Sequence, residues 1–207
     1  MQETTPYANS VFEQPWWLET VAPGCWGEVF VKEGDEVVAR LPYVLRHGCI
    51  TMPKNTQTLG PWIKPEYRAF QPGNTQLSRQ KEIIAELLAQ LPKHKSFDMY
   101  FDSVNDYILP YRWLGCRYEP SFSYRLVDLH DVDKIYENFN KAAKKNIRRA
   151  GKEIRICEGT DEAPLIDMTD KTFAHQNRKN PDSKDEIIRI VERSVAHQAG
   201  LVLTAVD

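Results

Sequence analysis

A basic stretch between Lys141 and Ile156 constrains the fold of this chain more than any other segment. At about 100° per residue, its apolar and charged side chains separate onto opposite sides of a helix. We expect this helix to begin at Val132 after an Asp131 N-cap. It should end at Gly151, because glycine adopts a left-handed conformation without a Cβ penalty. A strand, 154–157, follows directly. This order of helix, stop and strand predicts a β/α unit that opens a second module.

The predicted helix carries charge of one sign. Between Lys141 and Lys152 the chain has several cations and no acid. An exposed helix usually interleaves both charges, and a charge run is most often only a solvated face. A purely positive face also suits phosphates, carboxylates or a membrane surface. The cations of this face, with Arg149 at its border, are Lys141, Lys144, Lys145, Arg148 and Lys152.

Length and charge limit the function classes. The chain has 207 residues and a formal net charge of −2, so it has no global basic bias toward nucleic acid. It contains no run of about 18 apolar residues, and its polar start lacks the form of a signal peptide. We therefore expect no transmembrane segment and a soluble, cytoplasmic protein. The four cysteines are widely spaced and have no histidine at ligand spacing, so we interpret them as core residues rather than a metal site.

The rest of the sequence alternates predicted strands and helices, which indicates an α/β fold with a mixed, α+β sheet. A hairpin turning at Glu33–Asp35 is the clearest strand signal, and Pro42 marks an edge or a bulge in its second strand. Asn74 or Thr75 can cap a long helix. The predicted strands or extended segments are 28–31, 36–45, 49–52, 97–101, 116–129, 154–157 and 201–206. The further predicted helices are 15–21, 75–91, 107–114, 162–177 and 185–198.

The loop after the third predicted strand is polar at first and closes on Leu59-Gly60-Pro61-Trp62. A Gly-Pro pair after a strand is a simple turn in most proteins. In a second interpretation this loop lines a substrate site. The residues that would line it are Thr56, Gln57, Gly60 and Trp62.

Recognisable catalytic motifs are missing from the sequence. It has no Gly-rich phosphate loop, no GxSxG, no HExxH and no carboxylate pair at a diagnostic spacing. Its histidines are isolated from one another. Arg178 and Lys179 follow a predicted helix, where cations complement the helix dipole. The residues alone describe an α/β protein with an anion-seeking helix.

The stretch FNKAAKKNIRRAGKEIRI resembles the helix-to-strand signature of the Fem-type branch of the GNAT acyltransferase superfamily, although Gly151 falls earlier than the glycine of that pattern. The downstream segment TDKTFAHQNRKNP, between two helices, is also similar. So are TQTLGPW and LPYRWLGCRYEPSFSYRLVDL upstream. The resemblance spans nearly the whole chain. It implies a GNAT-like domain over residues 1–129 and the start of a second GNAT-like domain over residues 130–207.

The resemblance implies an N-acyltransferase that moves an acyl or aminoacyl group from acyl-CoA or aminoacyl-tRNA to an amine without a metal. The acceptors of the family are bacterial cell-wall precursors and small-molecule amines. By position, Lys145, Arg148 and Arg149 would hold phosphates at the domain junction, and Arg178 would hold an acceptor phosphate. Two other hypotheses stay open: a nucleic-acid or tRNA-binding module that uses residues 141–152, and a GNAT-like scaffold that binds without catalysis.

The sequence finishes on an apolar segment, Leu201 to Val206. We expect the second module to continue beyond Asp207, because a pyrophosphate cradle needs converging N–H groups that the segments before Asp207 do not supply. On this hypothesis the chain shows no acyl transfer by itself. The terminal strand, without a neighbour, should expose an edge that favours self-association.

Overall fold

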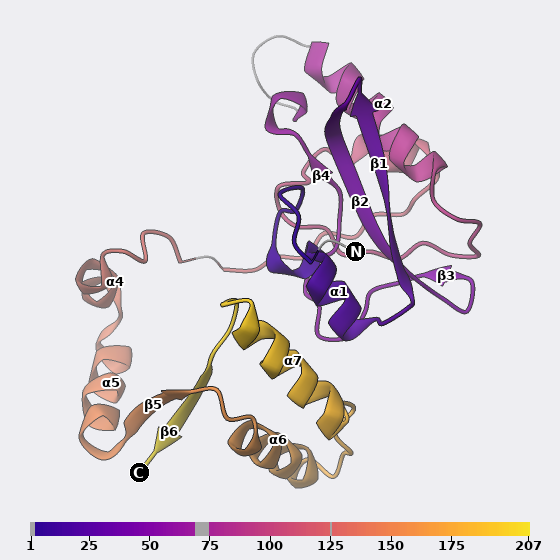
Figure 1. Ribbon diagram of the computed structural model, residues 1–207. Coiled ribbons are helices and arrows are strands. Elements are labelled where there is room, and N and C mark those ends of the chain that lie inside the picture. Colours follow the sequence, from indigo (N-terminus) through magenta and orange to yellow (C-terminus); the bar gives the residue numbers. More distant parts are fainter. Residues whose placement is uncertain (1–2, 69–74, 125) are drawn as a thin grey trace. The chain divides into compact units, whose positions relative to one another are not determined.

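A long antiparallel hairpin is the framework of the first half of the chain (Figure 1). In the computed structural model, which describes residues 3–68, 75–124 and 126–207, strand β1 (Trp26–Glu33) pairs with β2 (Glu36–Arg46). The turn between them depends on Gly34, whose φ of 61° is unfavourable for other residues. The predicted hairpin is therefore confirmed, with longer strands than expected.

Two short strands pair with the other side of β2. Strand β3 (Cys49–Ile50) pairs with its end, and β4 (Trp62–Ile63) pairs with its middle. Pro42 lies between these two pairings, where no described strand pairs with the edge of β2 opposite β1, so the missing N–H of Pro42 is tolerated. The shift in the pairing register of β1 and β2 lies in β1, between Val31 and Lys32, and not at Pro42.

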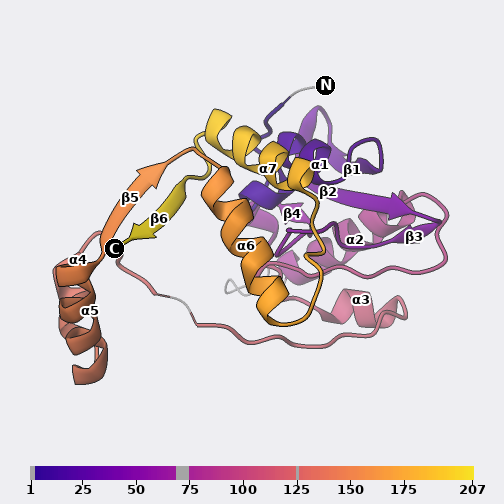
Figure 2. The same cartoon turned by 90° about the horizontal axis from the view of Figure 1, so that it is seen from below.

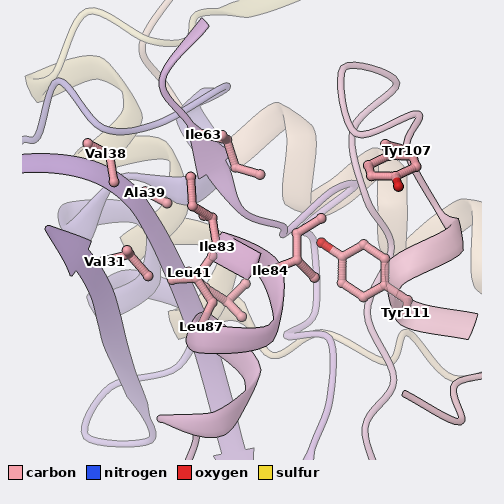
Figure 3. Close-up of a cluster of buried hydrophobic side chains, with 10 residues drawn as sticks. All are labelled: Val31, Val38, Ala39, Leu41, Ile63, Ile83, Ile84, Leu87, Tyr107 and Tyr111. Atoms are coloured by element: carbon pink, nitrogen blue, oxygen red, sulfur yellow. The ribbon is translucent and has the colours of Figure 1, made fainter. Parts of the chain in front are cut away.

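Helices cover both faces of this sheet. On one face, Ile83, Ile84 and Leu87 of α2 (Thr75–Ala89) pack against apolar side chains of the strands (Figure 3). Trp16 and Trp17 of α1 (Pro15–Val21) are buried, and the helix has the bounds that the sequence predicts. The other helices are η1 (Val11–Glu13), η2 (Pro65–Tyr67) and α3 (Leu109–Trp113).

Two predicted strands do not form within the described residues. In the segment 97–101, Met99 and Phe101 pack on the core while Asp98 and Tyr100 are exposed, as the alternation predicts. Its only strand-like pairing is a single bridge between Ile50 and Phe97, so the segment is extended chain. The described residues of 116–129 contain no strand either. The predicted Asn74 cap lies outside the described residues.

The chain divides into two compact units, Met1–Tyr118 and Glu119–Asp207. The division falls before Leu129, where the resemblance places the end of a first domain. Both units combine helices with small antiparallel sheets, so the mixed α+β class is confirmed.

The second unit contains four helices and two strands among its described residues. Strand β5 (Arg155–Gly159) pairs antiparallel with β6 (Val202–Val206), as Figure 2 shows. The expectation that the last strand has no neighbour is therefore wrong. The helices are α4 (Val132–Asn138), α5 (Lys141–Glu153), α6 (Ala163–His175) and α7 (Lys184–Ala196).

Helix α7 begins with a complete capping box. Ser183 Oγ accepts a hydrogen bond from the Glu186 N–H at 3.2 Å, and Glu186 Oε2 accepts one from the Ser183 N–H at 2.8 Å. This reciprocal pair confirms the start predicted from the sequence. Among the described residues of this unit, the buried apolar side chains are Ile166 of α6 and Val191 of α7. Across the described residues of the whole chain, no helix has the length and apolar character needed to cross a membrane.

Candidate anion-binding surface on helix α5

Helix α5 begins at its own N-cap. Asn140 Oδ1 accepts a hydrogen bond from the Ala143 N–H at 2.8 Å, and the preceding residue, Phe139, is extended. Asp131 caps α4 in the same way, through the Lys134 N–H at 3.0 Å. The predicted Asp131 cap is confirmed. The single helix expected from Val132 onward is wrong, because Asn140 starts a second helix.

The end of α5 also differs from the prediction. Gly151 lies inside the helix, which continues to Glu153. The last turn closes through a hydrogen bond from the Ile154 N–H to the Ala150 carbonyl at 2.7 Å. Ile154 itself has a φ of −118° and leads directly into β5. Gly151 is therefore not the left-handed cap that we expected.

The cations of α5 lie on one side of the helix. At about 100° per residue they fall within an arc of about 140°. Lys144 is half-buried and the others are exposed. The opposite side carries alanines and Ile147, whose side chain is 45% exposed. The surface that we call the α5 cation face consists of Lys141, Lys144, Lys145, Arg148, Arg149 and Lys152.

Within the part of the chain that the structure describes, no member of the α5 cation face forms an ion pair. Lys144 Nζ donates to the Glu137 carbonyl at 2.6 Å and lies 5.7 Å from the centre of the Tyr136 ring. Arg148 Nε donates to the Lys144 carbonyl at 3.3 Å. These partners are neutral, so the positive charge of the face is not compensated by a carboxylate.

The position of the cations along α5 is unfavourable for an isolated helix. Lys141 and Lys144 lie in or next to the first turn, which contains no acidic residue. The N-terminus of a helix has partial positive charge, which repels cations in that turn. A bound anion would relieve this repulsion and could form charge-assisted hydrogen bonds with lysine and arginine side chains.

Arg178 comes from a different element of the same unit. It follows α6, after Asn177 in a left-handed conformation with φ of 53°. Its backbone N–H donates to the Phe173 carbonyl at 2.9 Å, and its side chain is exposed, as is that of Lys179. No hydrogen bond or ion pair joins Arg178 to α5 in the described residues.

The predicted substrate loop lies in the first unit, where its residues make packing contacts. Thr56 Oγ1 accepts a hydrogen bond from Trp17 Nε1 at 3.0 Å. The Trp62 ring lies 5.1 Å from the Tyr7 ring, centre to centre. Gly60 is buried, whereas Gln57 is exposed. These contacts give the loop a structural role, and its substrate-lining role stays a prediction.

A buried polar cluster that the sequence did not predict lies beside this loop, where Asn9 Nδ2 donates to the Pro61 carbonyl at 3.0 Å. Arg40 of β2 is fully buried and pairs with Glu28 at 2.7 Å. Its Nη1 donates to the Tyr7 and Glu13 carbonyls at 3.1 and 2.8 Å. The Glu13 carboxylate is buried as well and accepts hydrogen bonds from Asn9. The available signal was Arg40 itself, a charge at the centre of the apolar strand sequence VVARLPYV.

Two other features of the described residues do not form sites. No group of three or more His, Cys, Asp or Glu side chains among them could hold a metal ion. A shallow hollow takes all its lining from α6 and the residue that follows it, and Lys171 in the hollow pairs with Asp167 at 2.6 Å. The hollow is lined by Met168, Lys171, Thr172, His175 and Gln176.

Comparison with known proteins adds no assignment: no protein-family model matches the chain, and no curated protein matches it.

Proposed function

We propose that the α5 cation face binds the phosphate groups of an activated acyl carrier, and that the protein acts in N-acyl transfer of the Fem type. The observation that supports this most directly is the uncompensated positive charge of α5. Six cations share one side of a helix, and none of them has a carboxylate partner among the described residues. A carrier such as acyl-CoA or aminoacyl-tRNA presents the negative charge that this face lacks.

Three residues are placed to share one phosphate group or two adjacent ones. Lys145 and Arg149 are four positions apart on α5, and Lys145 and Arg148 are three apart, so each pair lies side by side on the helix surface. The guanidinium groups can bind phosphate oxygens in a bidentate manner, and the lysine supplies a compact charge. We assign Lys145, Arg148 and Arg149 as the phosphate-binding residues.

The proposed reaction needs few ionisable side chains. The neutral amine of the acceptor attacks the carrier carbonyl, a C–N bond forms, and the C–S or C–O bond to the carrier breaks. The amine loses a proton and the carrier leaves with one. Positioning and backbone donors for the oxyanion supply most of the catalysis in such a reaction.

The acceptor is assigned from the resemblance. We propose a small-molecule or cell-wall-precursor amine, with Arg178 as the group that binds an acceptor phosphate. The lining role of Thr56, Gln57, Gly60 and Trp62 belongs to the same proposal.

The test compares Arg148→Ala with Arg117→Ala, since both arginines are exposed and lie in different units. Calorimetric titration with coenzyme A and with unacylated tRNA measures binding directly. Arg148→Ala should weaken binding by about 1.5–3 kcal/mol, the value of a charge-assisted hydrogen bond. Arg117→Ala should bind like the wild type. Equal affinities for all three proteins, with either ligand, would overturn the phosphate-binding proposal.

The same titrations separate the alternative functions. A nucleic-acid-binding module would bind duplexes with an affinity that falls with salt, at a slope of about −0.9 per neutralised phosphate on DNA, and would not bind coenzyme A. Acyl transfer from acyl-CoA or aminoacyl-tRNA to a panel of amines supports the enzyme. Carrier binding without transfer under all these conditions would favour a non-catalytic scaffold.

A further inference from the structure

Helix α3, in the first unit, buries one side and exposes the other. Pro110 and Tyr111 are buried, and Figure 3 shows the Tyr111 side chain directed toward Ile84 of α2. Leu109 and Trp113 lie four positions apart on the other side, and they are 45% and 60% exposed. Two buried side chains therefore hold this short helix in place, while a leucine and a tryptophan remain accessible.

Two cations lie beside this apolar pair. Arg112 is exposed three positions after Leu109, so the three α3 side chains fall within an arc of about 100°. Lys81 Nζ of α2 lies 5.8 Å from the centre of the Trp113 ring. Neither cation forms an ion pair among the described residues. The surface that we call the α3 ridge consists of Lys81, Leu109, Arg112 and Trp113.

The carboxylates of α2 lie on a different side of that helix from Lys81. Glu82 and Glu86 both pair with Arg79, which is at least 100° around the helix from Lys81. The neighbours of Lys81 on the helix surface are the residues three and four positions away, and none of them is acidic. They are Leu77, Ser78, Ile84 and Ala85.

The segment around α3 is also free of acids. From Tyr107 to Tyr118 the chain has two arginines and no Asp or Glu. The nearest acids along the chain are Asp106 and Glu119, which flank this segment. The segment is therefore positive, although the whole chain has a formal net charge of −2.

We propose that the α3 ridge binds the surface of a membrane that contains anionic lipids. Tryptophan favours the level of the lipid headgroups, where its ring is in an apolar medium and its N–H stays hydrated. Leu109 would enter the boundary of the acyl chains beside it. Lys81 and Arg112 would bind lipid phosphates, since their charged ends extend beyond their apolar stems. A membrane surface supplies the apolar medium and the negative charge together.

A single-stranded nucleic acid is the other class of ligand that combines aromatic stacking with cations. The composition of the surface favours lipid over this alternative. Lys81 already lies over the Trp113 ring, and leucine has no π face on which a base could stack. Leu114, directly after Trp113, adds a second aliphatic side chain that is 53% exposed.

Cosedimentation of the full chain with vesicles measures this binding. Vesicles with equal parts of phosphatidylcholine and phosphatidylglycerol are compared with phosphatidylcholine alone. Each cation near an anionic surface strengthens binding about fivefold, so Lys81→Gln with Arg112→Gln should lower the affinity for the mixed vesicles about twentyfold. The same double variant should bind phosphatidylcholine like the wild type. Trp113→Ser should lower the affinity for the mixed vesicles about tenfold, because it removes the largest apolar group of the ridge.

Tyr100→Ser is the matched control for Trp113→Ser. Tyr100 belongs to the same unit and is 61% exposed, but the residues two positions before and after it are Asp98 and Asp102. The control should bind mixed vesicles like the wild type, and circular dichroism checks that each variant is folded. Equal weakening by Tyr100→Ser and Trp113→Ser would show that any exposed aromatic residue contributes, and would overturn the assignment to the α3 ridge.

Arg148→Ala is measured in the same assay, because the α5 cation face also attracts anionic lipid. Binding that is unchanged in Trp113→Ser but weakened in Arg148→Ala would place the membrane contact on α5 and overturn the proposal. A wild-type chain that binds neither kind of vesicle would overturn it as well. Titration with oligouridylate tests the nucleic-acid alternative. If Trp113→Ser weakened binding to oligouridylate and not to vesicles, the ridge would be a nucleic-acid surface.

Discussion

Arg40 Nε lies 2.7 Å from Glu28 Oε2, although the Arg40 side chain is completely buried and the Glu28 side chain keeps 30% of its surface exposed. The two residues belong to β2 and β1, so the pair crosses the central hairpin. Arg40 also holds the backbone carbonyls of Tyr7 and Glu13. The pair therefore fixes the N-terminal segment onto the sheet.

Replacing Arg40 by alanine should destabilise the first unit strongly. The substitution leaves the half-buried Tyr7 carbonyl and the buried Glu13 carbonyl without this donor, and it removes the cation beside Glu28 and Glu13. Breaking a buried ion pair by removing one partner costs about 3–5 kcal/mol. Urea unfolding followed by tryptophan fluorescence measures this loss, because Trp16 and Trp17 are buried in the same unit.

Arg79→Ala provides the comparison. Arg79 makes contacts of the same length, 2.8 Å to Glu33 and 2.9 Å to Glu86, but these carboxylates are exposed. Surface ion pairs contribute about 0–1 kcal/mol, so the loss should be small. Similar losses for the two arginines would show that the burial of Arg40 is not the source of its effect.

The buried carboxyl group of Glu13 should make the free energy of unfolding depend on pH in an unusual direction. Burial raises the pKa of its carboxyl group above the ordinary 4.5, although hydrogen bonds from Asn9 and the charge of Arg40 act in the opposite direction. The folded protein therefore binds a proton at Glu13 more readily than the unfolded chain does. The ionised group is penalised at neutral pH, and the penalty is relieved as the pH falls through the folded pKa toward 4.5.

The measurement is the free energy of unfolding of wild type and Glu13→Gln between about pH 7 and pH 4. The stability of the wild type relative to the variant should rise as the pH falls. The titratable group that faces Glu13 is Arg40, which stays charged throughout this range. A relative stability that instead decreases on acidification would mean that hydrogen bonding to the carboxylate outweighs its burial.

Elements with local signals could be predicted from the sequence. The hairpin follows from Gly34 at its turn, α1 from Pro15 in its first turn, and α7 from the Ser183 and Glu186 capping box. These signals act within a few residues, so their outcome does not depend on the rest of the fold. The α5 cation face could be predicted for the same reason, because it depends only on the residue types and the helical spacing within residues 141–152.

Features that depend on distant partners could not be predicted. Residues 97–101 alternate as a strand does, yet a strand needs a continuous ladder with a neighbour. Among the described residues this segment forms a single bridge, between Phe97 and Ile50, and an isolated hydrogen bond from the Leu59 N–H to the Tyr100 carbonyl. The partner of β6 is β5, some fifty residues earlier in the chain. Nothing in the sequence of β6 indicates that β5 is its partner. The helix break at Asn140 is different, because asparagine is a strong N-cap residue and the local signal was present.

Gly60 lies in the loop that the sequence predicts to line a substrate site, and a larger residue there should destabilise the first unit. A Cβ at this position would lie 2.9 Å from Phe101 Cδ1 and 3.4 Å from Asn105 Nδ2. Phe101 packs against the core, so it cannot move away easily. Gly60→Ala should therefore destabilise the first unit by about 1–3 kcal/mol, as overpacking does. Thermal unfolding measures it, and an unchanged midpoint would show that the loop yields freely.

Gly151→Ala should stabilise the second unit. Gly151 is an interior residue of α5, and a Cβ there meets no other atom within 4 Å. Alanine in a helix interior is favoured over glycine by about 0.5–1 kcal/mol, because glycine loses more conformational freedom on folding. The free energy of unfolding measured in urea and the helical signal in circular dichroism should both increase.

Gly115→Ala is the matched control for this substitution. Gly115 also has open space around its Cα, but its φ is +89°, so alanine there is strained. The two substitutions add the same methyl group without a clash and should change stability in opposite directions. If Gly151→Ala destabilised the protein as Gly115→Ala does, Gly151 would be left-handed and α5 would end before Lys152. The cation face would then lose Lys152, and its last helical cation would be Arg149.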